Sequence, residues 1–165
     1  MKIELRFPRL SDAKRYLEIL SHPDFVYFPA KPKTLKEEQE FLRKSKQSRV
    51  QGALFDFAII AQGKHVGAAG IRIIEQHPYI CNIGYFVDRS FWNKGIASRA
   101  VELLETYIHD QLPDIVRIEI ITAQGNIASQ KVAIKSGYRK EGAMKKYLKV
   151  GNVYHDCYLY AKILK

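Results

Sequence analysis

The sequence predicts a single mixed α/β domain, with a mostly antiparallel central sheet flanked by helices. Two pairs of apolar stretches are separated only by short turns, as the strands of antiparallel hairpins are. Between these pairs, strand-like and helix-like stretches alternate, which is typical of β-α-β-α units. The 165 residues contain no repeat, low-complexity stretch or linker, so we expect one domain over residues 1–165.

The N-terminal part of the chain carries signals for one strand and one helix. Residues 2–7 alternate between apolar and polar types, as a half-buried strand does. Residues 11–20 are expected to form a helix capped by Ser11 or Asp12. Three prolines then make residues 21–33 a loop, because proline lacks the backbone N–H that helices and sheets need.

A second helix follows this loop and leads into the first hairpin. Thr34 is the expected N-cap, with Glu37 three residues on as its capping-box partner, and the helix runs to about Val50. Two apolar strands are then joined by a glycine-containing turn at residues 62–64. These strands span residues 54–61 and 65–74.

The C-terminal half alternates strands with helices and ends in the second hairpin. A strand at 80–87 precedes a helix that starts near Ile96, and a strand at 115–122 precedes a helix from Asn126 to Gly137. The last two strands, 139–150 and 152–163, meet at a Gly-Asn turn. The residues expected to face the core are Ile96, Ala100, Val101, Leu103, Leu104, Tyr107 and Ile108 in the first helix and Ala128, Val132 and Ile134 in the second.

The composition narrows the class of protein. No apolar run approaches the roughly 18 residues of a membrane span, and the first residues lack the apolar core of a secretory signal. The two cysteines, Cys81 and Cys157, lie in strand-like stretches, so we expect reduced core residues of a cytoplasmic protein. Five scattered histidines show no ligand spacing, which predicts no metal site.

The chain is strongly basic, with 27 Lys and Arg against 17 Asp and Glu and a net charge of +10. The basic residues gather in residues 31–49 and 131–149. Such a surface steers acidic partners toward the protein and could also serve a polyanionic ligand. A merely solvated basic surface is the alternative interpretation.

Residues 90–98 are the most informative segment of the chain. They read S-F-W-N-K-G-I-A-S and lie between a predicted strand and the start of a predicted helix. The first N–H groups of a helix have no intrahelical partner, and the helix dipole is positive there, so this loop predicts a phosphate site. Gly95 easing a tight strand-to-helix turn is the alternative explanation.

A second motif, Asn-Ile-Ala-Ser at residues 126–129, follows the next strand. The order strand, W-N-K-G-I-A, helix, strand, N-I-A-S, helix, G-Y resembles the GNAT superfamily of N-acetyltransferases, in particular its RimJ/RimL-like branch. The family loop reads Arg/Gln-x-x-Gly-x-Gly/Ala, which Gly95 and Ala97 match, whereas Trp92 replaces the commoner Arg or Gln. The resemblance also covers both ends of the chain. It implies the GNAT fold, a mixed, mostly antiparallel sheet with splayed strands and flanking helices.

The resemblance also assigns a donor site for acetyl-CoA. The Tyr85 amide would meet the acetyl carbonyl, and Val87 would pair with the pantetheine arm, although ordinary strand packing explains both residues equally well. Asn126 would bind pantetheine or order its loop, and Ser129 would donate to the departing thiolate, unless it is simply a residue of the first helical turn. The loop residues that would hold the CoA pyrophosphate are Trp92, Asn93, Lys94, Gly95, Ile96, Ala97 and Ser98.

A general base is harder to place. Related sequences often carry Glu at the position of Asn82, before Ile-Gly-Tyr. The nearest carboxylate on a central strand is Glu119, whose alternative role is an ion pair with Arg117 or a lysine. An α-amino group has a pKa of about 8, so water could carry its proton, whereas a lysine side chain needs a stronger base. The sequence therefore favours an α-amine or another small amine over lysine.

The acceptor side is assigned by the same resemblance. Tyr154 and Asp156 are the expected amine contacts, while Tyr158 and Tyr160 of the same strand are expected to serve packing. We expect an acidic protein N-terminus, of the ribosomal-protein type, as the acceptor of a monomeric or homodimeric enzyme. A small-molecule amine acetyltransferase and a catalytically silent acyl-CoA-binding module remain alternatives. No helix-turn-helix, zinc-finger or RNP-like pattern supports nucleic-acid binding, which we do not expect.

Overall fold

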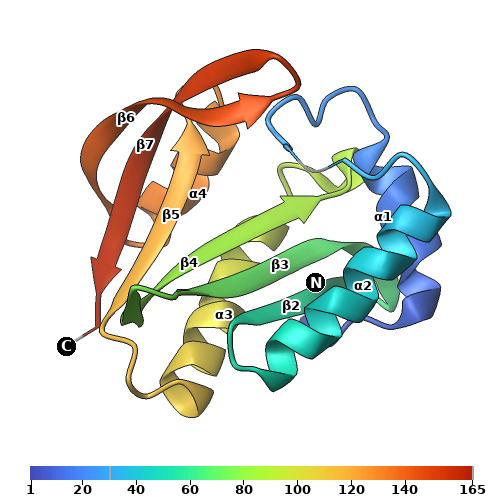
Figure 1. Cartoon of the computed structure of the whole chain (residues 1–165), viewed down its shortest axis with the longest axis horizontal. Coiled ribbons are helices and arrows are strands. Elements are labelled where there is room, and N and C mark those ends of the chain that lie inside the picture. The colour runs from blue at the N-terminus through green and yellow to red at the C-terminus, as the bar shows by residue number, and fades with distance from the viewer. Residues whose placement is uncertain (30, 165) are drawn as a thin grey trace.

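The computed structural model describes residues 1–29 and 31–164, and its centre is one seven-stranded sheet (Figure 1). The strand order is β1-β2-β3-β4-β5-β7-β6, and every neighbouring pair is antiparallel except β4 and β5, which are parallel. The strands are β1 (Ile3–Arg6), β2 (Leu54–Ala61), β3 (Lys64–Ile74), β4 (His77–Val87), β5 (Arg117–Ala123), β6 (Arg139–Val150) and β7 (Val153–Ile163). The mixed, mostly antiparallel sheet is the architecture that the sequence predicts.

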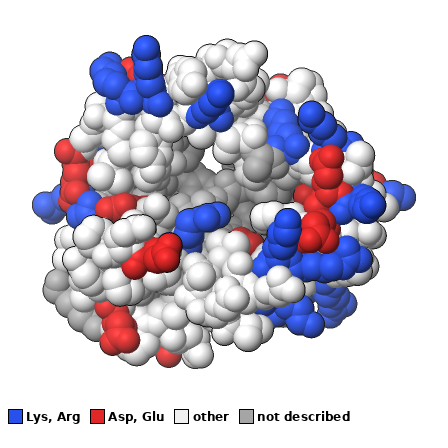
Figure 2. Space-filling view, in the orientation of Figure 1, with Lys and Arg blue, Asp and Glu red and all other residues white. Residues whose placement is uncertain are grey.

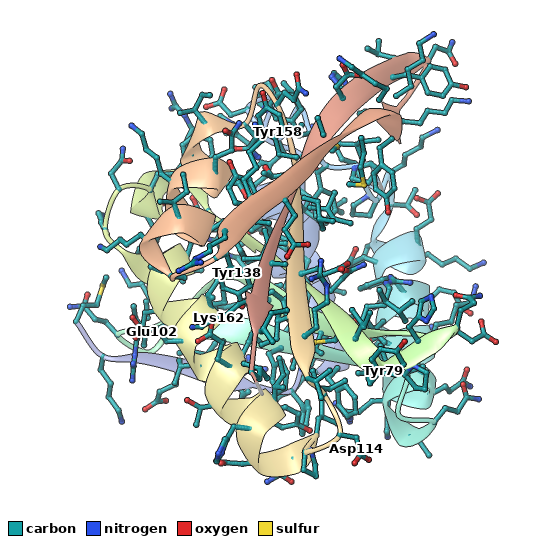
Figure 3. The ribbon with its side chains drawn as sticks, turned by 90° about the vertical axis from the view of Figure 1, so that its left-hand side faces the viewer. Tyr79, Glu102, Asp114, Tyr138, Tyr158 and Lys162 are labelled. Atoms are coloured by element: carbon teal, nitrogen blue, oxygen red, sulfur yellow. The ribbon has the colours of Figure 1, made fainter. Side chains whose placement is uncertain are left out.

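Helices cover both faces of this sheet, as Figures 1 and 3 show from two directions. The α helices are α1 (Ala13–Leu20), α2 (Leu35–Val50), α3 (Ile96–Gln111) and α4 (Ile127–Lys135), and two 3-10 turns occupy Leu10–Asp12 and Arg89–Phe91. On one face, α1 and α2 enclose a small core around Tyr16, Leu42 and Ala58. On the other, α3 packs its predicted face against the sheet, with Leu104 and Ile108 fully buried.

Most local signals are confirmed by the structure. The β2–β3 turn has positive φ at Gln62 (50°) and Gly63 (76°), as a tight hairpin turn requires. The Thr34 hydroxyl accepts from the Glu37 N–H at 3.2 Å. The Glu37 carboxylate accepts from the N–H of Lys33 (2.8 Å), one residue further back than in a capping box. Cys81 and Cys157 are buried and not bonded to each other.

The predicted cap of α1 is wrong in its detail. A 3-10 turn precedes this helix, and neither Ser11 nor Asp12 caps it through its side chain. The Asp12 carboxylate instead accepts two bonds from the Arg6 guanidinium (2.7 and 2.8 Å) and one from the Arg9 N–H (2.7 Å). Burial alone would raise the pKa of Asp12, but these charge-assisted bonds outweigh it and hold that pKa below its usual value.

The predicted core face of α4 is also only partly right. Val132 is partly buried, but Ala128 is exposed and Ile134 is 61% exposed, while Ala133 is fully buried. The helix packs mainly against α3 and β5, and most of its other surface is exposed. No helix in the described part of the chain combines the length and apolar character that crossing a bilayer demands.

The carboxyl group of Glu38 is buried between α2 and the sheet. The residue is only 5% exposed. Burial and, second, the charge of Asp56 on β2 raise the pKa of Glu38 to about 7. Asp56 is itself held by the Ser45 hydroxyl, which donates to it at 2.6 Å. This pair of carboxyl groups therefore makes the stability of the domain depend on pH.

Replacing Glu38 with Gln is expected to stabilise the protein above neutral pH. The carboxyl pKa rises from 4.5 in the unfolded chain to about 7 in the folded one, so the free energy of unfolding falls as pH rises through this window. Because the residue is still 5% exposed, solvent reduces the effect of this shift, and we expect a gain of about 1–2 kcal/mol at roughly pH 8 and none near about pH 4. Urea unfolding at both pH values measures it.

Glu75→Gln, at an exposed carboxyl in the β3–β4 turn, serves as the control and should show no pH-dependent gain. An equal gain from Glu38→Gln at both pH values would mean that ionisation is not its cause.

Candidate active site at the divergence of β4 and β5

The strands β4 and β5 run together for only three residue pairs and then separate (Figure 1). The last pair joins Asn82 to Glu119. Beyond it, β4 continues along β3 as far as Val87, and β5 continues along β7 as far as Ala123. The splayed strands that the sequence led us to expect are therefore present, and they leave backbone groups of β4 without a partner on β5.

The backbone of Tyr85 and Val87 points into this divergence. The N–H of Asp88 donates to the carbonyl of Val66 on β3 at 2.7 Å. This bond makes Gly67 and Val87 a non-hydrogen-bonded pair of the antiparallel ladder, and the pairs alternate along the strand. The N–H and C=O groups of Val87 and Tyr85 thus point away from β3 and toward β5. An amide in this position can stabilise negative charge that develops on a carbonyl oxygen.

The Trp92 side chain already binds one of these backbone groups of β4. Its indole N–H donates to the Val87 carbonyl at 2.6 Å, and its ring lies edge-on to Phe25 at 6.1 Å. Of the polar backbone of Val87, the N–H remains available to a ligand arm. The residue that departs from the family loop therefore has a defined position beside the divergence.

The loop before α3 has the geometry of an anion site. Gly95 is the N-cap of α3 with φ of +75°, and no side chain caps the helix. The first helical bond runs from the Arg99 N–H to the Gly95 carbonyl, so the N–H groups of the residues between them have no acceptor within the helix. Nothing lies within 4 Å of the place where a Gly95 side chain would begin. A phosphate group can therefore approach this backbone closely.

The side chains of Asn93 and Lys94 lie next to this anion site. Asn93 has φ of +60°. The Lys94 ammonium donates to the Ser90 carbonyl at 2.9 Å and lies 4.9 Å from the centre of the Phe91 ring, so its charge stays next to the loop. An open hollow of about 420 Å³ adjoins the loop and is lined by His22, Asp88, Arg89, Ser90, Trp92 and Asn93.

Ser129, the expected partner of the departing thiolate, lies in the first turn of α4. The Asn126 side-chain oxygen accepts from the Ser129 N–H at 3.1 Å, which caps the helix. The Ser129 hydroxyl is 3.1 Å from the hydroxyl of Tyr85, which also lies 3.3 Å from the Ser129 carbonyl. Burial raises the pKa of Tyr85 to about 12, so this phenol stays protonated near neutral pH. The two sides of the divergence thus meet in a pair of hydroxyls.

Sequence reasoning assigned a role to the amide of Tyr85 and none to its hydroxyl. Tyr85 and Ser129 are 44 positions apart, and no local pattern couples a tyrosine on a strand to a serine in a later helix. Only the placement of α4 beside β4 brings them together.

Glu119 is committed to an ion pair. Its carboxylate accepts from the Arg117 side chain at 2.7 Å, and the same guanidinium binds Glu141 of β6 at 3.1 and 2.5 Å. The ion-pair interpretation of Glu119 is therefore confirmed. Asn82, its partner across the parallel pair, offers no charge.

Asp156 and Tyr154, the expected amine contacts, both have local partners. The Asp156 carboxylate accepts from the Lys145 ammonium and from the Lys146 N–H, both at 2.8 Å. Residues 145–147 form a bulge opposite Asp156 alone, and φ of Lys146 is +51°, so this carboxylate holds the bulge of β6. Tyr154 is 55% exposed near the tip of the hairpin. Acceptor binding by either residue stays a prediction.

The loop between α1 and α2 reaches across the divergence. Figure 1 shows this loop beside the β6–β7 hairpin. The Tyr27 ring lies 5.3 Å from the His155 ring of β7, and its hydroxyl fills the space that a side chain at Gly125 would need. On the other half-sheet, Asp24 pairs with Arg89 and Phe25 contacts Trp92. One loop therefore touches both the anion-site loop and the far side of the divergence.

The chain is similar in sequence to known acetyltransferases. A family model described as an acetyltransferase (GNAT) domain matches residues 2–139. An uncharacterized N-acetyltransferase, p20, of Bacillus licheniformis is 27% identical over 97% of this chain and 92% of its own. The ribosomal-protein-serine acetyltransferase of Escherichia coli (strain K12) is 29% identical over 78% of this chain and 73% of its own.

Solved structures agree on the fold. An acetyltransferase from Salmonella typhimurium, described as modifying the N-terminal serine of ribosomal protein L7/L12, superposes with a TM-score of 0.89 at 25% identity, covering 100% of this chain and 96% of its own. The microcin C7 self-immunity acetyltransferase MccE, solved with acetyl-CoA and AMP, gives 0.88 at 21% identity, covering 99% and 93%. The second likeness shows the fold alone.

Proposed function

Because the chain belongs to the acetyltransferase (GNAT) family and is an N-acetyltransferase, we propose that its acceptor is the α-amino group of an acidic protein. GNAT enzymes take the acetyl group from acetyl-CoA. Residues 1–165 act as one domain in this proposal, and the buried, unbonded cysteines suit a cytoplasmic enzyme. The observation that carries the proposal is the divergence of β4 and β5, where free backbone groups of β4, the uncapped start of α3 and a pair of hydroxyls lie together.

The donor half of the site fits acetyl-CoA. The open N–H groups at the start of α3, together with the positive end of the helix dipole, suit its pyrophosphate. The Tyr85 N–H suits the acetyl carbonyl, and the Val87 N–H suits an amide of the pantetheine arm. The side-chain oxygen of Asn126 is committed to the helix cap, so its NH₂ group is left for the donor.

The proposed reaction needs only a weak base to accept the proton of the amine. A bond forms between the amine nitrogen and the acetyl carbon, and the bond between that carbon and sulfur breaks. Water accepts the amine proton, and sulfur leaves as a thiolate that takes a hydrogen bond from Ser129. An α-amino group, with a pKa of about 8, is partly neutral at pH 7, whereas a lysine side chain is almost wholly charged.

The electrostatics favour the same acceptor. Glu119 is tied to Arg117, and Asn82 is neutral, so neither supplies a free carboxylate that could deprotonate a lysine. The net charge of +10 attracts an acidic partner, and Figure 2 shows lysines and arginines at many points around one face, with acidic side chains among them. Two relatives are named for acting on ribosomal proteins, one of them on an N-terminal serine.

A pair of matched peptides tests the acceptor. The first peptide is acidic, contains no lysine and has a free N-terminus. The second differs from it in two ways: its N-terminus is blocked, and one residue is replaced by lysine. We expect acetylation of the first alone, with kcat/KM falling steeply as salt rises, because steering by opposite charge acts on the association rate. Release of the CoA thiol measures the rate, and a basic peptide of equal length is the control.

Other outcomes assign other functions. Efficient acetylation of a small uncharged amine with no dependence on salt would make the chain a small-molecule acetyltransferase. Binding of acetyl-CoA without transfer to any amine would make it a silent acyl-CoA-binding module.

A further inference from the structure

Two hydroxyl groups meet at the centre of the candidate site. Tyr85 projects from β4 and Ser129 from the first turn of α4, with 3.1 Å between their oxygens. The Tyr85 side chain is largely enclosed, and its only described hydrogen-bond partners are the hydroxyl and the carbonyl of Ser129. These contacts lie where the two half-sheets part, beside the backbone groups that suit the acetyl carbonyl.

Either hydroxyl can donate across this 3.1 Å contact, and the phenol proton can also reach the Ser129 carbonyl at 3.3 Å, so the donor is assigned from the chemistry of the two groups. A phenol is a better donor than an aliphatic hydroxyl, and it offers one proton. When Tyr85 donates to the Ser129 oxygen, Ser129 keeps its own proton and one lone pair for other partners. Without Tyr85, the serine side chain has three staggered rotamers and could turn toward the backbone of its own helix.

We propose that Tyr85 is a positioning residue, whose hydroxyl donates to Ser129 and aims the Ser129 O–H at the sulfur atom of the donor. The inference rests on the proposed role of Ser129 and deepens it. No covalent bond changes at Tyr85, and its proton stays in place throughout. The raised pKa of Tyr85, about 12, keeps the phenol neutral over the ordinary assay range.

Tyr85→Phe tests this inference because it removes the hydroxyl and keeps the ring. We expect kcat to fall about tenfold, which is the usual effect of losing one positioning hydrogen bond, while the KM for acetyl-CoA stays the same. The loss should be equal from about pH 6 to about pH 9, since the phenol does not titrate in that range. The double variant Tyr85→Phe/Ser129→Ala should be no slower than Ser129→Ala alone, because the tyrosine acts only through the serine.

Tyr160→Phe is the matched control. Tyr160 is 3% exposed, and its hydroxyl donates to the Gln130 side chain on the same helix, one residue beyond Ser129, at 3.3 Å. This variant removes a tyrosine hydroxyl of β7 that contacts α4, without touching Ser129, so kcat should not change. Thermal unfolding of both variants separates a loss of stability from a loss of turnover.

The possible results separate the two proposals. A full kcat in Tyr85→Phe, together with a large loss in Ser129→Ala, would overturn the role of Tyr85 and leave that of Ser129 in place. Additive losses in the double variant would also overturn it. No loss in Ser129→Ala would instead remove the proposed role of the serine itself. Ser129→Thr keeps a hydroxyl within reach of Tyr85, so it should recover part of the turnover that Ser129→Ala loses, and only when Tyr85 is present.

Discussion

Replacing Gly95 with Glu is expected to raise the KM for acetyl-CoA about 100-fold, equivalent to about 2.7 kcal/mol. Two physical effects add up in this variant. The backbone at Gly95 has φ of +75°, a conformation that costs a side-chain-bearing residue about 1–2 kcal/mol. The carboxylate would also project into the open space before α3 and repel the phosphates of the ligand. Calorimetric titration with acetyl-CoA measures the loss directly.

Gly63→Glu is the matched control for this prediction. Gly63 lies in the β2–β3 turn with φ of +76° and has the same open surroundings. The substitution therefore imposes the same backbone strain and the same added charge far from the loop. Its affinity for acetyl-CoA should equal that of the parent protein. If Gly95→Glu binds acetyl-CoA as tightly as this control, the loop before α3 does not hold the pyrophosphate.

Replacing Ser129 with Ala is expected to lower kcat by roughly tenfold to a hundredfold, while acetyl-CoA affinity stays nearly intact. A departing thiolate develops its charge mainly in the transition state, so a hydrogen bond to it affects turnover more than ground-state binding. The helix should persist, because the cap uses the backbone N–H of residue 129, which alanine keeps. Steady-state kinetics with saturating acceptor measures kcat, and calorimetry measures the affinity.

Ser136→Ala gives the comparison that this test needs. Ser136 lies at the C-terminal end of the same helix, where its carbonyl accepts from Lys162 at 3.2 Å (Figure 3 labels Lys162). Loss of its hydroxyl should leave kcat unchanged. Turnover of Ser129→Ala within twofold of the parent would mean that water or another group assists the thiolate.

The local architecture could be predicted from the sequence because its signals are short in range. A hairpin turn, a helix cap such as Asn126 and a left-handed glycine such as Gly95 each depend on the backbone geometry of a few consecutive residues. The face of α3 follows from the 3.6-residue period of its apolar residues. Family resemblance added the site by matching the two loop motifs.

The local signals failed where a charged group outside the helix competes for a side chain, or where neighbouring elements pack against only part of a helix. Asp12 has the character of a helix cap, but the Arg6 guanidinium offers its carboxylate two charge-assisted bonds, which are stronger than a cap. The apolar residues of α4 predict a core face, but the neighbouring elements bury Ala133 fully and leave Ala128 and Ile134 exposed. Periodicity shows which residues share a face, and the neighbouring elements decide whether that face is buried.

The sequence by itself therefore determined most of the secondary structure, the class of fold and the position of the loop that is predicted to bind an anion. Only the tertiary structure decided which side chains from distant parts of the chain meet: Tyr85 with Ser129, Tyr27 with His155, and Arg117 with Glu141. The physical reason is the topology of the sheet. Parallel pairing of β4 with β5 for only three residues separates the strands and sets α4 against the open end, and no pattern within a short stretch of sequence encodes where two strands part.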